Sequence, residues 1–117
     1  MTIGERGELR AAEYLQNKGF YILERNYRTR RGEIDLICAN DRYLVFVEVK
    51  TRSSTSFGMP CEAVTYGKQQ KLILTARQWL QEHPTELQPR FDVVEILVSP
   101  NHTTCRMHHI PNAFEVV

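Results

Sequence analysis

The sequence of 117 residues predicts one α/β domain, a mixed β-sheet with flanking helices in the order α-β-β-β-α-β-β. Two segments have the apolar spacing of a helix, and five are rich in the β-branched and aromatic residues typical of strands. The second helix separates two strands, which predicts parallel pairing of those strands through a right-handed crossover. A chain of this length buries one core, so we expect no internal domain boundary over residues 1–117.

The first helix is expected over residues 2–18. Leu9, Ala12 and Leu15 form its apolar stripe, and Gly19 is a typical helix stop. Glu8 belongs to the same stripe by its spacing, so its carboxylate should point toward the core and needs a partner there.

Three antiparallel strands should follow, over residues 20–25, 33–38 and 43–50. With Asn40-Asp41 as a two-residue hairpin turn, paired positions of the last two strands sum to 81. Asp35 then lies opposite Phe46, as a diagonal neighbour of Glu48 at roughly 7–8 Å between backbones.

Residues 51–60 are rich in Ser, Thr, Gly and Pro and predict an exposed loop. Pro60 and Glu62 suit the first turn of a short helix. The main helix is expected over residues 68–82, followed by a strand over 91–98 that lies beside strand 43–50, and by a short edge strand over 106–110.

Acidic residues in an apolar strand environment mark a candidate metal site. Glu48 follows four apolar residues, and burying a lone carboxylate is costly. Glu48 and Lys50 share one strand face with Asp35 on the neighbouring strand, while Glu33 and Glu8 add further acids. Carboxylate and carbonyl oxygens suit Mg²⁺ or Mn²⁺, so Asp35, Glu48 and the Val49 carbonyl form the expected ligand set. The alternative is an exposed Glu48–Lys50 ion pair with no further role.

Basic residues border these acids and predict a nucleic-acid partner. The formal net charge of +1 decides little, because the placement of the cations matters more than their sum. The candidate phosphate contacts are Arg28, Arg30, Arg31, Arg52, Lys68 and Lys71. A solvated charged loop is the alternative for the arginine segment.

The spacing of Asp35 before Glu48-Val49-Lys50, in this element order, resembles the PD-(D/E)xK restriction-endonuclease-like superfamily, which includes archaeal Holliday junction resolvases. Over nearly its whole length the chain resembles the YraN-type family of small predicted endonucleases. The matching stretches are Gly7-Glu8, Asn26-Tyr27-Arg28, Arg31-Gly32-Glu33-Ile34-Asp35-Leu36-Ile37, Val45-Phe46-Val47-Glu48-Val49-Lys50-Thr51-Arg52, Phe91-Asp92-Val93 and Asn112-Ala113-Phe114. Ile34 replaces the superfamily's proline.

The resemblance implies a restriction-endonuclease-like fold and a Mg²⁺- or Mn²⁺-dependent endonuclease. Asp35, Glu48 and Lys50 would be the catalytic set, with Glu8 as an auxiliary acid of the metal site. Structured or branched DNA is the expected substrate. Superfamily nucleases often act as dimers, so a homodimer is also consistent with the resemblance.

Two other functions remain open from the residues alone. The chain could be a nucleic-acid-binding module of a DNA-processing complex that does not cleave, or a structural protein whose acids form an ion-pair network. We expect Asp92 to pair structurally, and His108 and His109 to be surface residues that point to opposite faces.

The three cysteines are odd in number and widely spaced, which favours free thiols in a reducing compartment. No stretch approaches the ~20 apolar residues of a membrane span, and the amino terminus has no apolar signal core. We therefore expect a cytoplasmic protein.

Overall fold

The computed structural model describes residues 2–53, 64–99, 101 and 105–115. Its elements are α1 (Ile3–Asn17), β1 (Tyr21–Arg28), β2 (Glu33–Ala39), β3 (Tyr43–Ser53), α2 (Tyr66–Glu82), β4 (Gln88–Val98) and β5 (Cys105–Phe114). One sheet has the order β1-β2-β3-β4-β5, in which β3 and β4 are parallel and all other neighbours are antiparallel. The predicted element order and the parallel pairing are confirmed.

Side-chain caps fix where both helices begin. The Thr2 hydroxyl accepts a hydrogen bond from the Glu5 N–H at 3.1 Å, and the Thr65 hydroxyl accepts one from the Lys68 N–H at 3.2 Å. Because Thr65 caps α2, that helix begins two residues before the expected start. Gly19 follows α1 with a φ of +98°, the left-handed conformation that ends many helices. None of the helices in the described ranges is long and apolar enough to cross a membrane.

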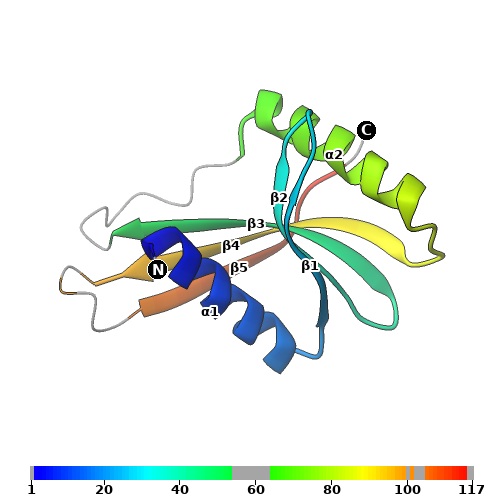
Figure 1. Cartoon of the computed structure of the whole chain (residues 1–117). Coiled ribbons are helices and arrows are strands. Elements are labelled where there is room, and N and C mark those ends of the chain that lie inside the picture. The colour runs from blue at the N-terminus through cyan, green and yellow to red at the C-terminus, as the bar shows by residue number, and fades with distance from the viewer. Residues whose placement is uncertain (1, 54–63, 100, 102–104, 116–117) are drawn as a thin grey trace.

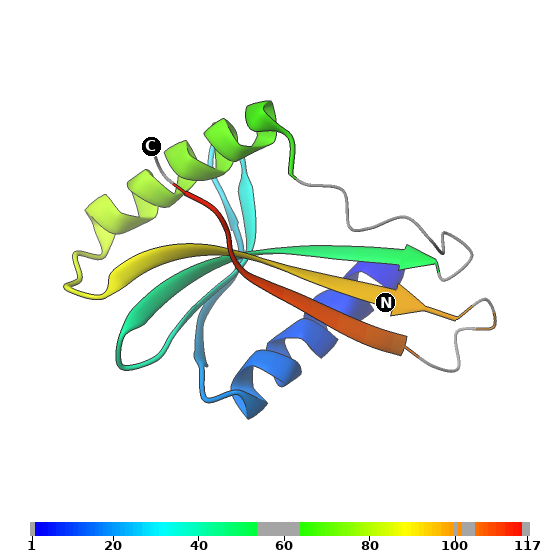
Figure 2. The same cartoon turned by 180° about the vertical axis from the view of Figure 1, so that it is seen from behind.

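The helices cover opposite faces of the sheet (Figures 1 and 2). Leu44 and Phe46 of β3 pack in the same core cluster as Trp79 of α2. Val45 and Val47 alternate with them and pack in the cluster of Leu15 of α1. Because both of its faces are covered, β3 has a continuous apolar run in place of an alternating one.

The predicted register of the β2–β3 hairpin was wrong by two positions. Leu36 pairs with Val47 and Ala39 with Leu44, so paired positions sum to 83 and the turn residues are 41 and 42. The reason is the side chain of Asn40, whose Oδ1 accepts hydrogen bonds from the N–H groups of Arg42 and Tyr43 at 2.9 and 2.7 Å. Asn40 therefore precedes the turn. A shift of two residues preserves which face each side chain occupies.

Several strands are longer than the sequence predicted. β1 continues to Arg28, since a tight turn at Thr29–Gly32, closed by the Thr29 N–H and the Gly32 carbonyl at 2.8 Å, is all that separates it from β2. The first three residues of the predicted 51–60 loop belong to β3. The rest of that loop and the short helix at Pro60 and Glu62 lie outside the described residues.

Candidate functional site

The β2 and β3 strands diverge beyond the pair Leu36–Val47, where the ladder between them ends, and we call this point of divergence the fork. The predicted acids Asp35 and Glu48 lie there. Beyond it, the β1–β2 hairpin turns toward α2 while β3 continues beside β4 (Figure 1). Asp35 and Glu48 are the first residue on each arm. Continued by one position past the pair Leu36–Val47, the corrected register aligns Asp35 with Glu48, in place of the diagonal arrangement that the sequence predicted.

The hairpin is held against α2 by two contacts. A Cβ at Gly32 would lie 3.0 Å from the Thr75 hydroxyl oxygen, a tight contact that glycine avoids where the hairpin meets α2. The Tyr27 hydroxyl donates to Oε1 of Glu82, the last residue of α2, at 2.6 Å. These contacts direct the hairpin away from β3 and thereby open the fork.

Asp35 is tied to the opposite arm through the main chain. Its Oδ2 accepts a hydrogen bond from the Val49 N–H at 2.7 Å. Burial, followed by the nearby charge of Glu48, raises the pKa of Asp35 to about 7. N–H and C=O of one strand residue point to the same side, so the Val49 carbonyl is also directed toward the gap between the arms.

Glu48 is buried, with 7% of the residue exposed, and it pairs with a lysine. Lys68 Nζ in the first turn of α2 lies 2.5 Å from Glu48 Oε1. Together these groups line a cleft of about 230 Å³, whose lining residues are Gly32, Glu33, Asp35, Glu48, Lys68, Lys71 and Leu72. The cleft therefore contains Asp35 and Glu48, two of the three carboxylates predicted for the metal site, and two of the predicted basic residues.

Glu8 lies at the edge of this site and is half-buried. Its charge contributes to the raised pKa of Asp35, which places it near that carboxylate. With its amide nitrogen turned toward the acids, Asn26 donates to Glu8 Oε1 at 3.0 Å and to Glu33 Oε1 at 3.2 Å. Asn26 has a φ of +52° within β1, a conformation that asparagine tolerates better than most residues. It is the partner that Glu8 required.

A glycine places Glu8 there. A Cβ at Gly7 would collide with the hydroxyl oxygen of Thr51 in β3. Glycine at position 7 lets α1 approach β3 closely enough for the next residue, Glu8, to reach the fork.

The carboxylate pair fits a hard divalent cation. In the described part of the chain, no group of three or more His, Cys, Asp or Glu side chains is placed to hold one ion. The groups at the fork that could hold a cation are the carboxylates of Asp35 and Glu48 and the carbonyl of Val49. Mg²⁺ usually keeps several waters and binds through one or two carboxylates, so this small set suffices for it.

Lys50 extends from the same face of β3 as Glu48 and stands beside Glu95 in the β3–β4 register. Sequence reasoning missed Glu95, which is 4% exposed and pairs with Arg52 Nη1 at 2.9 Å. The signal was available, because Glu95 interrupts an apolar strand as Glu48 does. Arg52 is thus held by a buried acid outside the cleft.

The arginines of the β1–β2 hairpin occupy the rim of the site. Arg28 pairs with Glu33 at 3.3 Å, and both side chains are largely exposed. Arg30 and Arg31 are exposed at the turn. Of the predicted phosphate contacts, the structure thus brings Lys68 and Lys71 into the cleft, Arg28 to its edge, and Arg30 and Arg31 to the hairpin tip.

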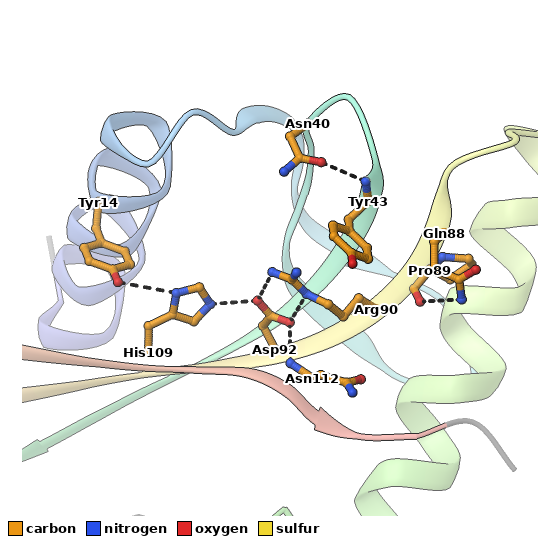
Figure 3. Close-up of polar contacts among 9 residues, drawn as sticks. All are labelled: Tyr14, Asn40, Tyr43, Gln88, Pro89, Arg90, Asp92, His109 and Asn112. Carbon is orange, nitrogen blue, oxygen red and sulfur yellow. Dashed lines mark hydrogen bonds and ion pairs between the residues drawn. The ribbon is translucent and has the colours of Figure 1, made fainter.

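A second polar cluster lies on the opposite face of the sheet (Figure 3). Asp92, fully buried, accepts two hydrogen bonds from Arg90 at 2.9 Å and one from the Asn112 N–H at 2.9 Å, and pairs with His109 Nε2 at 2.7 Å. The hydrogen bonds from His109, Arg90 and Asn112 lower the pKa of Asp92 despite its burial. The hydroxyl oxygen of Tyr14 in α1 lies 3.4 Å from His109 Nδ1.

This cluster confirms the structural pairing of Asp92 and corrects the expectation for His109. His108 and His109 do point to opposite faces, but His109 has only 12% of its side chain exposed and links β5 to α1. The residues that His109 contacts, Asp92 and Tyr14, are distant from it in sequence, so local sequence patterns do not indicate these contacts. A larger cavity of about 600 Å³ along the other side of α2 is lined mainly by apolar groups and contains none of the predicted site residues.

The chain is similar along nearly its whole length to bacterial proteins of one family. The UPF0102 protein of Caldanaerobacter subterraneus is 46% identical over 115 residues, covering 97% of this chain and 94% of that protein. That of Geotalea daltonii is 47% identical, covering 98% and 91%. The model described as "Uncharacterised protein family UPF0102" matches residues 7–96, a range that includes the whole fork. These matches confirm the family-level resemblance to YraN-type proteins, and the chain belongs to the UPF0102 family.

Proposed function

We propose that this protein is a metal-dependent nuclease that hydrolyses phosphodiester bonds, with structured or branched DNA as substrate. The observation that carries the proposal is the juxtaposition of Asp35 and Glu48 at the fork of β2 and β3. An apolar strand pair has no structural need for two neighbouring carboxylates, and burial, followed by the nearby charge of Glu48, raises the pKa of Asp35. A divalent cation would relieve that repulsion.

The chain's own groups have distinct roles in this proposal. Asp35, Glu48 and the Val49 carbonyl would hold Mg²⁺ or Mn²⁺, which when bound acidifies a coordinated water and offsets charge that develops on the phosphate. Lys50, on the same strand face as Glu48, would orient the attacking water or stabilise that charge. Glu8 would support the metal site through Asn26 or a water.

Basic side chains around the fork supply what a polyanion requires. Lys68 and Lys71 line the cleft, and Arg28, Arg30 and Arg31 lie on the adjoining hairpin. Phosphate contacts of this type position the backbone of a nucleic acid without reading its sequence. This arrangement suits a substrate recognised by shape, and we propose a restriction-endonuclease-like fold for the chain.

A nucleic-acid-binding module that does not cleave is the second candidate. The ion pair between Lys68 and Glu48 favours it, because a lysine compensates Glu48 without any metal. A purely structural ion-pair network is the third reading, and it predicts no metal binding.

Cleavage assays with the purified protein separate these functions. The substrates should include single-stranded, duplex, flap and four-way-junction DNA, with the matching RNAs, each with Mg²⁺, Mn²⁺ or EDTA. The nuclease proposal predicts metal-dependent products that disappear in Asp35→Ala and Glu48→Ala. Binding without products in every metal would support the non-cleaving module, and equal cleavage by both variants would place the active site elsewhere.

A further inference from the structure

We propose that Lys68 is an internal counter-ion that occupies Glu48 until a divalent cation binds, and that its ammonium group then moves to a phosphate of the nucleic acid. This inference rests on the proposed function, because it concerns the same carboxylate pair. It would make metal binding and substrate binding cooperative through one side chain.

The two partners differ in how freely they can move. The side chain of Glu48 is 9% exposed and belongs to the central strand, whereas that of Lys68 is 48% exposed at the edge of the cleft. The backbone of Lys68 is anchored, since its N–H donates to the cap residue Thr65. Its flexible four-carbon stem can still reorient. Lys68 is therefore the member of the pair that can leave.

The position of Lys68 in α2 makes pairing of its ammonium group with an anion favourable. It lies in the first turn of α2, where the helix dipole disfavours a positive charge, and that turn contains no acidic residue. The compensating anion comes from the sheet, as Glu48. A phosphate at the cleft would offer the same compensation after Glu48 becomes occupied.

A divalent ion on the Glu48 carboxylate would repel the ammonium group of Lys68, which lies on Oε1 of the same carboxylate. In this exchange the ammonium group withdraws toward solvent when the divalent ion binds. Lys71, one turn further along α2, lines the same cleft. The released Lys68 and Lys71 would then form a paired phosphate contact on one wall of the cleft.

Manganese binding tests the exchange directly, with no need for activity. Mn²⁺ affinity would be measured by calorimetry for the parent protein, Lys68→Met and the matched control Lys71→Met. Removing a competing cation should tighten Mn²⁺ binding of Lys68→Met by roughly threefold or more. Lys71→Met should change it less. Lys68→Gln, which retains a polar contact to Glu48, provides a second variant should the methionine protein fold poorly.

The salt dependence of binding to a phosphorothioate-linked duplex is the second readout. With Mn²⁺, Lys68→Met should lower the salt slope by about 0.9, the value of one phosphate contact on a duplex, and with EDTA it should not. Lys71→Met should lower the slope in both conditions.

The outcomes distinguish this inference from the proposed function. If the parent binds Mn²⁺ but Lys68→Met and Lys68→Gln bind it equally or more weakly, Lys68 is a structural or positioning residue and the exchange is refuted. If the parent binds no Mn²⁺ at all, the metal site and the exchange both fail. A slope loss of equal size with and without Mn²⁺ would make Lys68 an ordinary phosphate contact.

Discussion

Asp35 accepts a hydrogen bond from the amide of Val49, which joins β2 to β3 just past the point where their ladder ends. The bond fixes one predicted ligand against the main chain beside the other, Glu48. It also explains why Asp35 and Glu48 remain together although the strands that bear them diverge.

Asp35→Asn should remove a pH-dependent destabilisation of the metal-free protein. Because the pKa of Asp35 is raised from 3.8 to about 7, the folded state binds more protons than the unfolded state between these values, and stability falls as pH rises through that window. At pH 8 the variant should therefore unfold at a higher urea concentration than the parent. Its free energy of unfolding should be larger by up to about 2 kcal/mol after allowing for the partial exposure of Asp35. At pH 4 the two should differ little. Parallel pH profiles in EDTA would contradict the raised pKa.

Asp92→Ala should destabilise the fold by about 3–5 kcal/mol, since it leaves the Arg90 side chain, only 16% exposed, without its carboxylate. His109→Gln should cost less, because the Arg90–Asp92 pair remains. Since hydrogen bonds lower the pKa of Asp92, its contribution is present above pH 3.8 and is lost as pH falls below that value through the folded pKa. Urea unfolding at neutral and acid pH measures both effects. Weakened Mn²⁺ binding in a folded His109→Gln protein would mean that the two faces of the sheet are coupled.

Gly7→Ala and Gly4→Ala form a matched pair in α1. The first should lower the free energy of unfolding by about 1–3 kcal/mol, because the added methyl group collides with Thr51. The second should raise it by up to about 1 kcal/mol, since the nearest atom is at 3.9 Å and alanine is the better helix former. Thermal or urea unfolding of the two proteins provides the comparison. Equal effects would show that α1 does not depend on close contact with β3.

Neutralising Arg30 and Arg31 with glutamine should weaken nucleic-acid binding for all sequences and lower the salt slope by roughly 0.7–0.9 per lost phosphate contact. Arg28→Gln is the control and should change the slope less, because Arg28 already pairs with Glu33. Fluorescence anisotropy titrations over a range of salt concentrations measure the slope. An unchanged slope in the double variant would mean that this turn is a solvated loop that makes no phosphate contacts.

Local chemistry predicted most of the fold. The apolar run of β3, the helix spacing around Leu15 and Trp79, and the crossover through α2 each have a local cause, and the structure has all three. The register error at Asn40 came from a side chain acting on its own backbone, an effect that strand propensity does not describe.

The site was predictable where residues share a strand and less so where they meet through packing. Asp35, Glu48 and Lys50 follow from strand alternation on a hairpin. The partners Asn26 of Glu8, Lys68 of Glu48 and Arg52 of Glu95 depend on how α1, α2 and β4 sit on the sheet. Those contacts join residues that are remote in sequence. A single sequence contains no periodic pattern or fixed spacing that indicates such contacts.

An anomalous-difference map from a crystal soaked in Mn²⁺ tests most directly the central claim that Asp35 and Glu48 hold the catalytic ion. We expect a peak at the fork, bound by both carboxylates and the Val49 carbonyl, with Lys68 withdrawn from Glu48. The same soak of a Glu48→Gln crystal should weaken or abolish the peak. A map without a peak at the fork, in which Lys68 still contacts Glu48 at saturating Mn²⁺, would contradict the claim.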